Sequence, residues 1–204
     1  MKLYFTPGSC SLAPHIALQE SGIHHTITKV DLSTHKLEDN TDYYTINSRG
    51  SVPLLVLDNG EQITETAVIL QYIADQAPEK KLAPAHGTLA RVRLQETLNF
   101  IATKLHKGTG LFFNPKVDES TKLLFRQRLR NFHEMMNKKI SETGWLIGHQ
   151  FTVADAYLYV VMRWAIKLDL DISGLDSIAD FMKRMKERPM DEAYERKTHG
   201  CSCT

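Results

Sequence analysis

Hydrophobic and polar positions divide this chain into two parts with different periodicities. In the first part, short runs of β-branched and aromatic residues alternate with segments of helical spacing, which indicates alternating strands and helices. Asp58-Asn59-Gly60 contains Asn-Gly, a strong hairpin signal, and joins two of the runs. The expected strands are 2–6, 25–32, 52–57 and 62–64, and the expected helices are 12–21 and 65–77, with room for a short helix in the loop after residue 32. This order predicts a small mixed sheet with helices packed on it.

The second part has helical spacing throughout, and no strand is expected there. Residues 78–87 contain two prolines, a glycine and charges, and we interpret them as a linker. They separate an α/β domain at 1–77 from an all-helical domain at 88–204. The expected helices of the second domain are 88–108, 120–142, 152–168 and 176–188. The third is apolar on most sides, which is typical of a central buried helix.

Thr152 and Asp155 begin this third helix with a variant of the capping box, in which Asp takes the place of Glu or Gln. Phe151 precedes them as a candidate hydrophobic staple. We therefore assign this motif to folding.

Charge and composition exclude several classes of protein. The 204 residues carry 25 Lys and Arg against 24 Asp and Glu, so the basic excess typical of nucleic-acid binding is missing. No apolar run approaches the ~20 residues that a membrane span requires, and the apolar stretch before Pro7 is too short for a signal peptide. Three cysteines, an odd number, fit a reducing compartment. We expect a cytoplasmic protein without nucleic-acid or membrane partners.

Cys201 and Cys203 lie in the polar tail, close to His199. Two thiols and a histidine could bind a soft metal. A loose end of this kind is a weak metal signal, so we expect exposed thiols without function and no metal.

Cys10 follows a Pro-Gly turn and stands four positions before Pro14. Proline is tolerated in the first turn of a helix, where the N–H groups have no intrahelical partner. Pro14 therefore places the helix start near Cys10 or Ser11. There the helix dipole and the unpaired N–H groups would favour the nucleophilic thiolate. The alternative is a small buried hydrophobic residue, and Cys10 taken alone does not decide between the two.

Two further segments of the first part could hold a peptide-like ligand. If the Val52-Pro53 bond is cis, the N–H and C=O of Val52 turn outward unpaired and an extended peptide could dock there, although most such bonds are trans. Thr64 or Thr66 is a candidate N-cap of the next helix, with Glu65 beside it. A helix N-terminus binds carboxylates and a glutamate binds ammonium groups, so this segment is either an α-amino acid site or a plain cap.

In the second part, Asn99, Thr103 and His106 stand at i, i+4 and i+7 and form a polar stripe on the expected helix. Such a stripe is usually the solvated face. However, these residue types differ from the Lys/Glu mixture that solubility requires. A histidine can hydrogen-bond a sulfur or move a proton near neutral pH.

Together these features resemble the glutathione S-transferase family. The first part resembles its thioredoxin-like glutathione-binding domain, and the second, with "TVADAYL", resembles its helical domain. The specific match is to the bacterial beta class, whose marks stand here as "PGSCS", "VP", "ET" and "LHKG". The resemblance covers the chain except its last few residues. It implies an α/β thioredoxin-like N-terminal domain of βαβ-ββα order, an all-α C-terminal helical domain, and a homodimer.

The resemblance also implies a role for each matching residue. Cys10 would lie at the glutathione sulfur, the backbone of Val52 would pair with the cysteinyl part, and Glu65 and Thr66 would hold the γ-glutamyl end. Cys10 and His106 are the implied catalytic groups. The implied glutathione-binding residues are Cys10, Ser11, His35, Val52, Pro53, Glu65, Thr66, Asn99, Thr103, His106 and Lys107. An electrophile pocket would be lined by Phe112, Phe113, Tyr157 and Trp164.

Two positions depart from the family pattern. His35 stands where a lysine often reaches the glutathione carboxylate, and a histidine loses its charge near neutral pH, so binding is expected to weaken as pH rises. Tyr4-Phe5 reverses the Phe-Tyr order of some relatives. Neighbouring strand residues face opposite sides, so no tyrosine hydroxyl serves the sulfur from position 5.

The expected function is a glutathione transferase that conjugates reduced glutathione to small, largely apolar electrophiles. Thiol–disulfide exchange through a mixed disulfide could coexist with conjugation, and it would use one thiol because position 13 is Ala13. The alternative from another class is a non-catalytic module that binds a ligand or a protein on a transferase scaffold.

Overall fold

The computed structural model describes residues 1–188, so His199, Cys201 and Cys203 lie outside the described residues. The described chain forms two compact units, Met1–Lys80 and Lys81–Arg188. Residues Pro78–Lys80 form a short 3₁₀ helix, η2, at the end of the first unit. The exact extent of the linker at 78–87 stays a prediction.

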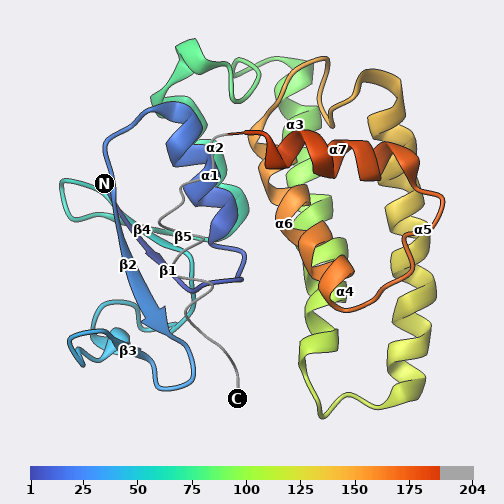
Figure 1. The fold of residues 1–204 in the computed structure, drawn as a ribbon. Helices are drawn as coiled ribbons and strands as arrows, with labels where there is room; N and C mark the ends of the chain where they lie inside the picture. Colours follow the sequence, from blue (N-terminus) through green and yellow to red (C-terminus); the bar gives the residue numbers. More distant parts are fainter. Residues whose placement is uncertain (189–204) are drawn as a thin grey trace. The chain divides into compact units, whose positions relative to one another are not determined.

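The first unit contains a mixed five-stranded sheet in the order β3-β2-β1-β4-β5 (Figure 1). The central strand β1 runs parallel to β2 and antiparallel to β4, and β4 and β5 form the hairpin at Asn59-Gly60. The strands are β1 (Lys2–Phe5), β2 (Thr26–Asp31), β3 (Lys36–Leu37), β4 (Leu54–Val56) and β5 (Gln62–Thr64). The sequence pattern missed β3, because two residues are too few to show any periodicity.

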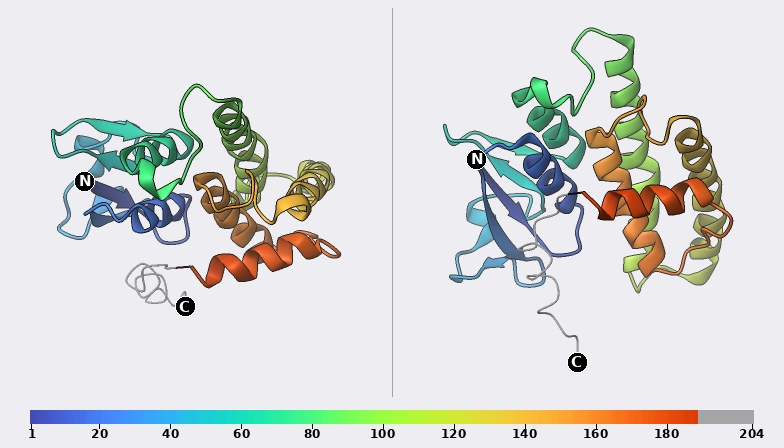
Figure 2. Two further views of the ribbon diagram at one scale, coloured as in Figure 1. Left: turned by 90° about the horizontal axis from the view of Figure 1, so that it is seen from above. Right: turned by 45° about the horizontal axis from the view of Figure 1, so that its top comes forward.

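Helices α1 (Leu12–Ser21) and α2 (Thr66–Gln76) pack against each other on the same face of this sheet (Figure 2). On the other face, Tyr4 lies in an apolar cluster with Val30, Tyr43 and Leu54. The loop before β4 carries a short 3₁₀ helix, η1 (Tyr43–Thr45), which supplies Tyr43 to this cluster. Apolar side chains thus cover both faces of the sheet. This packing fixes the positions of the ends of β1 and β4, which lie next to the candidate site.

All regular elements among the described residues of the second unit, 81–188, are helices. Its central helix, α6, is buried along nearly its whole length, as the apolar pattern predicted. No helix among residues 1–188 has the length and apolar character needed to cross a membrane. The elements are α3 (Leu89–Phe100), η3 (Ile101–His106), α4 (Lys107–Gly110), η4 (Leu111–Phe113), α5 (Glu119–Thr143), α6 (Val153–Lys167) and α7 (Asp176–Lys186).

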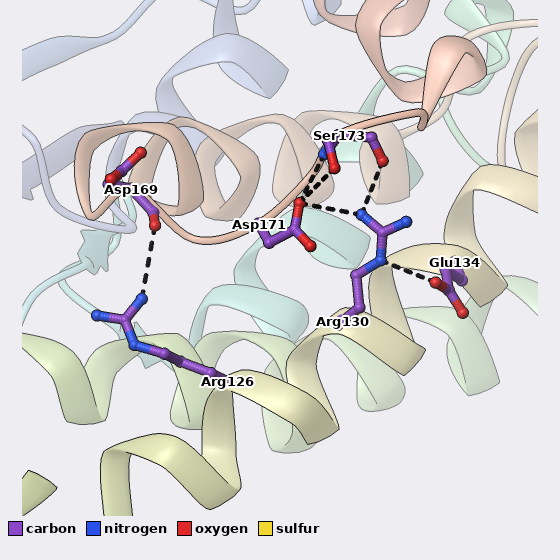
Figure 3. Close-up of polar contacts among 6 residues, drawn as sticks. All are labelled: Arg126, Arg130, Glu134, Asp169, Asp171 and Ser173. Atoms are coloured by element: carbon purple, nitrogen blue, oxygen red, sulfur yellow. Dashed lines mark hydrogen bonds and ion pairs between the residues drawn. The ribbon is translucent and has the colours of Figure 1, made fainter.

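Two arginines of α5 hold the loop between α6 and α7 (Figure 3). Arg130 donates to the carbonyl of Ser173 at 2.8 Å and to the carboxylate of Asp171 at 3.4 Å. Arg126 donates to the carbonyl of Asp169 at 3.5 Å. These contacts join the loop to α5. Helix α7, which follows the loop, packs its apolar side against α5 as well.

The capping box at the start of α6 is confirmed, and it is buried. Asp155 is fully buried and accepts from the Thr152 N–H at 2.8 Å and from the Thr152 hydroxyl at 2.9 Å. Its second oxygen accepts from the Leu146 N–H at 2.9 Å. Burial raises the pKa of Asp155 to about 6, although these donors act in the opposite direction. This carboxyl group therefore joins the preceding loop to the central helix.

We expect Asp155→Ala to lower the free energy of unfolding by about 3 kcal/mol or more, because it leaves two buried N–H donors without an acceptor. Asp118, the exposed N-cap of α5, accepts from the Thr121 N–H at 2.9 Å and provides the control. Asp118→Ala is expected to cost about 1 kcal/mol. Urea denaturation followed by circular dichroism measures both. Equal losses in the two variants would contradict the structural role of Asp155.

His133 of α5 gives the helical unit a pH-dependent stability. Its side chain is fully buried, and neither ring nitrogen has a hydrogen-bond partner among residues 1–188. Burial, with a smaller contribution from the charge of Arg130, lowers the pKa of His133 to about 4. An unfolded histidine has a pKa of about 6.5. The unfolded chain therefore binds more protons between these values, and stability is lost as pH falls from 6.5 towards 4.

We expect the free energy of unfolding of the parent to fall more steeply between pH 6.5 and pH 4 than that of His133→Leu. The difference between the two curves should reach about 3 kcal/mol, the free energy that corresponds to this pKa change. Groups common to both proteins cancel in the comparison. Parallel curves over this range would show that His133 does not titrate differently in the folded state.

Candidate functional site

Helix α1 begins at Leu12 with Ser11 as its N-cap, so the helix start predicted from Pro14 is confirmed. Pro14 is the third residue of the helix, where its missing N–H leaves no intrahelical bond unmade. Cys10 directly precedes the N-cap and thus lies at the positive end of the helix dipole.

The N–H groups around this helix start are not unpaired, in contrast to the sequence prediction. The Leu12 N–H bonds to the Ser9 carbonyl at 3.3 Å, and the Ala13 N–H bonds to the Cys10 carbonyl at 3.1 Å. The chain continues the helix backwards as a tight turn, which satisfies these donors. Of the two effects expected at this helix start, only the dipole of α1 therefore acts on the Cys10 thiol.

Ser11 supports this turn with its side chain. Its hydroxyl accepts from the Thr6 N–H at 3.2 Å and lies 2.6 Å from the Ser9 hydroxyl, and the residue is fully buried. Its N–H donates to the Ser9 hydroxyl at 3.2 Å, and its predicted contact with glutathione stays a prediction.

Cys10 and Val52, which are distant in sequence, meet in the structure. Cys10 is 8% exposed, and its thiol lies 3.6 Å from the carbonyl oxygen of Val52 and donates to it. The Val52-Pro53 bond is cis, and β4 begins one residue later. The expectation that both backbone groups of Val52 are unpaired holds only for the N–H, which has no acceptor among the described residues.

At the start of α2 the predicted N-cap was wrong: Glu65, and neither threonine, is the N-cap. Its φ of 69° is positive, a conformation that is strained for a residue with a side chain. This backbone turns the Glu65 carbonyl into the helix, where it accepts from the N–H groups of Val68 and Ile69. The N–H groups of Thr66 and Ala67 have no acceptor among residues 1–188, so this helix start can bind an anion.

Arg49 lies beside this helix start, and sequence analysis missed it. Its guanidinium donates to the Thr64 hydroxyl at 3.2 Å and lies 3.6 Å from the Glu65 carboxylate. An arginine in a loop gives no signal of its own, because only the fold brings it beside residues that follow 15 positions later in the chain. The start of α2 thus combines a carboxylate with cationic and N–H groups, which suits an α-amino acid head group.

His35 lies in the same unit, at a turn with a positive φ of 52°. Its ring packs on Tyr44 with a centroid distance of 4.5 Å, and a side chain at Gly50 would collide with Tyr44. The Nδ1 atom of His35 is buried without a partner among the described residues. A ligand carboxylate would therefore have to meet the other ring nitrogen, Nε2.

In the helical unit, the predicted regular helix at 88–108 is interrupted by a π-helical segment at Ile101–His106. Its hydrogen bonds run to i+5, so the expected spacing of Asn99, Thr103 and His106 on one face does not hold through it. Asn99, Thr103 and Lys107 are exposed, and the Thr103 hydroxyl donates back to the Asn99 carbonyl at 2.9 Å. Only His106 of this stripe turns into the unit.

His106 packs against α6. Its Nδ1 lies 2.6 Å from the Tyr157 hydroxyl, and its ring centroid is 4.9 Å from that of Trp164. Burial, and then the charge of Lys107, lowers the pKa of His106 to about 4. The imidazole is therefore neutral at physiological pH.

The four aromatic residues assigned to an electrophile pocket are placed differently. Phe113 is half exposed and its ring contacts Trp164, with centroids 5.8 Å apart. Phe112 lies under the guanidinium of Arg126 instead. Tyr157 is only 2% exposed, so it supports His106 more than it lines a surface. Among residues 1–188, no cluster of acidic, His or Cys side chains is suited to a metal.

Comparisons with known proteins agree with this architecture. Residues 8–76 match the family model of the glutathione S-transferase N-terminal domain, and residues 100–189 match that of the C-terminal domain. Glutathione S-transferase GstA of Escherichia coli O157:H7 is 44% identical over 189 residues, which cover 93% of this chain and 94% of that protein.

Solved structures agree over nearly the whole chain. A sphingomonad glutathione S-transferase complexed with glutathione has a TM-score of 0.92 at 38% identity, and the match covers 98% of this chain and 99% of that one. A bacterial beta class glutathione S-transferase from Sphingomonas chungbukensis has a TM-score of 0.90 at 39% identity, with coverages of 97% and 98%. The chain therefore belongs to the glutathione S-transferase family.

Proposed function

We propose that this protein is a glutathione transferase that conjugates reduced glutathione to small, largely apolar electrophiles. The observation that carries the proposal is the 3.6 Å contact between the Cys10 thiol and the Val52 carbonyl. The first residue is assigned to the glutathione sulfur and the second to the backbone of the same cysteinyl unit. A single bound cysteinyl unit can reach both, because the fold brings them into contact.

The α/β unit supplies groups for both ends of the tripeptide. The Val52 N–H pairs with the cysteinyl backbone, in the manner of an added strand. Glu65 binds the γ-glutamyl ammonium, and the Thr66 N–H and hydroxyl bind its carboxylate at the start of α2. His35 binds the carboxylate at the other end. Pro53 and Ser11 shape this surface through the backbone.

The helical unit supplies His106 for the sulfur, and Phe113 and Trp164 for the apolar part of the electrophile. Asn99, Thr103 and Lys107 are exposed polar groups of the same helical segment, and the family resemblance assigns them to the tripeptide. His106 either donates a hydrogen bond to the sulfur or accepts its proton. These assignments rest on the resemblance and on the neutral, partly buried ring of His106.

The reaction needs no covalent bond to the protein. The glutathione thiol loses its proton to His106 or to water, the thiolate attacks an electrophilic carbon, and the leaving group departs with its electron pair. Groups that stabilise the thiolate raise its fraction at ambient pH, and binding places it near the carbon.

Thiol–disulfide exchange is a second activity that the same geometry supports. The Cys10 thiolate attacks the glutathione sulfur of a mixed disulfide between glutathione and another thiol, the S–S bond breaks, and the other thiol leaves as a thiolate. Position 13 is alanine, so a reduced glutathione thiolate must then attack the Cys10–glutathione disulfide, which frees Cys10 and forms oxidised glutathione. A purely non-catalytic binding module is the rival hypothesis. Conjugation activity in the experiments below would contradict it.

We extend the proposal to a cytoplasmic homodimer. The cytoplasmic location rests on the odd number of cysteines. The dimer rests on the family resemblance and on the exposed apolar side chains of α3, where Leu89 is 68% and Val92 is 51% exposed.

Cys10→Ala is expected to abolish the mixed disulfide between protein and glutathione, because Cys10 is the thiol assigned to the ligand sulfur. Both proteins are prepared with Cys201→Ser and Cys203→Ser, incubated with oxidised glutathione and weighed by mass spectrometry. The parent should gain one glutathione and the variant none. Equal uptake would refute the assignment of Cys10. Conjugation of a chloronitrobenzene-type electrophile, measured on the same samples, ranks the two activities.

His35→Ala is expected to raise the KM for glutathione roughly 10-fold, because it removes a hydrogen bond to a charged carboxylate. The kcat at saturating glutathione should change little, since His35 is assigned to the end of the tripeptide remote from the sulfur. His24→Ala is the matched control, because His24 is not assigned to the site. Steady-state kinetics at a fixed saturating electrophile concentration measure both variants, and an unchanged KM in His35→Ala would show that His35 does not bind the carboxylate.

A further inference from the structure

Tyr157 is a buried polar residue that conjugation chemistry, as described so far, does not use. It is the fifth residue of the central helix α6 and is 2% exposed. Its hydroxyl lies 2.6 Å from Nδ1 of His106, a short contact between residues 51 positions apart in the chain. The other ring nitrogen of His106, Nε2, has no hydrogen-bond partner among the residues described.

The contact sets which nitrogen of His106 carries the proton. A neutral imidazole has one N–H donor and one acceptor nitrogen. A phenol is a good donor and imidazole nitrogen a good acceptor, whereas a phenol oxygen accepts weakly. The stronger arrangement is therefore O–H of Tyr157 donating to Nδ1, and this leaves the proton of His106 on Nε2.

The surroundings of the ring hold this state in place. The rings of Tyr157 and Trp164 both make T-shaped contacts with the imidazole, at interplanar angles of 85° and 69°. Both residues belong to α6, so this one helix fixes the position of the imidazole. Burial and the neighbouring charge of Lys107 disfavour the imidazolium and keep His106 neutral at physiological pH. Protonation of Nδ1 would also break the bond from Tyr157, because that nitrogen would become a donor.

We propose that Tyr157 is a positioning residue that fixes His106 as the Nε2–H tautomer, so that His106 serves the glutathione sulfur as a hydrogen-bond donor and does not act as its base. The proposal rests on the proposed function for the sulfur itself and selects between the two roles left open there. A neutral donor stabilises the thiolate, which is the species that attacks.

In this role Tyr157 orients His106 and does not line an electrophile pocket. A residue that lines an electrophile pocket should alter the range of electrophiles when it is replaced. A residue that orients His106 should instead change the rate with all electrophiles by a similar factor, because it acts through the sulfur.

The first test is spectroscopic and needs no substrate. A long-range ¹H–¹⁵N correlation spectrum distinguishes the two neutral histidine tautomers, and His106→Gln identifies the signal of His106 by its disappearance. The parent should show the Nε2–H tautomer, and Tyr157→Phe should show a mixture of the two. An Nδ1–H tautomer in the parent would overturn the proposal, and that spectrum suffices even if Tyr157→Phe does not fold.

The second test is kinetic and uses the same variants at saturating glutathione. Tyr157→Phe should lower kcat roughly 3- to 10-fold, the effect of one lost neutral hydrogen bond, with little change in KM. His106→Gln places an N–H near the Nε2 position and should retain more activity than His106→Ala. Equal losses in these two variants, or an unchanged kcat in Tyr157→Phe, would show that an Nε2–H donor is not what His106 supplies.

The two tests separate this proposal from the proposed function. A protein with the predicted spectra that conjugates no electrophile contradicts the transferase assignment and leaves the tautomer assignment standing. An active transferase with the Nδ1–H tautomer contradicts the role of Tyr157 alone.

Discussion

Every α-helix begins with backbone N–H groups that have no partner inside the helix, and this constraint organises both units of the protein. At α6 the buried carboxylate of Asp155 accepts from the Thr152 N–H, and the Leu82 carbonyl accepts from the Val153 N–H. At α7, Asn137 reaches across from α5 and accepts from the Ile178 N–H. At α1 the backbone of the preceding turn accepts them. At α2 the N–H groups of Thr66 and Ala67 are left over among the described residues.

The difference between these helix starts separates folding from function. Where a side chain or a turn satisfies the donors, the helix start stabilises the fold and leaves no free N–H group for a ligand. The start of α2 keeps its donors because Glu65 adopts a positive φ and directs only its carbonyl into the helix. A strained backbone is retained here and the donors stay open, which is the pattern expected where a ligand completes the structure.

The sequence predicted the elements well where their periodicity is long. The helix at 12–21 was predicted with the correct bounds, because Pro14 and Gly22 mark its two ends, and the helix predicted at 120–142 is one residue shorter than α5 at each end. The N-cap of α2 was wrong because propensity favours threonine over glutamate, and a positive φ cannot be read from residue types. Sequence analysis missed Arg49, and it assigned Tyr157 to a pocket without its contact to His106, because the partners of these residues lie 15 and 51 positions away.

Sequence analysis also missed the π-helical segment at Ile101–His106, because α- and π-turns share the same residue preferences. It holds one residue more in its turn than an α-helix does. Removing a single residue between 101 and 105 would therefore let the helix return to regular winding. The part that follows would keep nearly its present direction, because the wider turn takes up the roughly 100° that one residue adds to an α-helix. If the segment kept its length and wound as a regular α-helix, that part would instead rotate by about 100° about the helix axis. His106 would then face a different direction with its side chain unaltered, so the π-turn is as much a part of the site as the histidine itself.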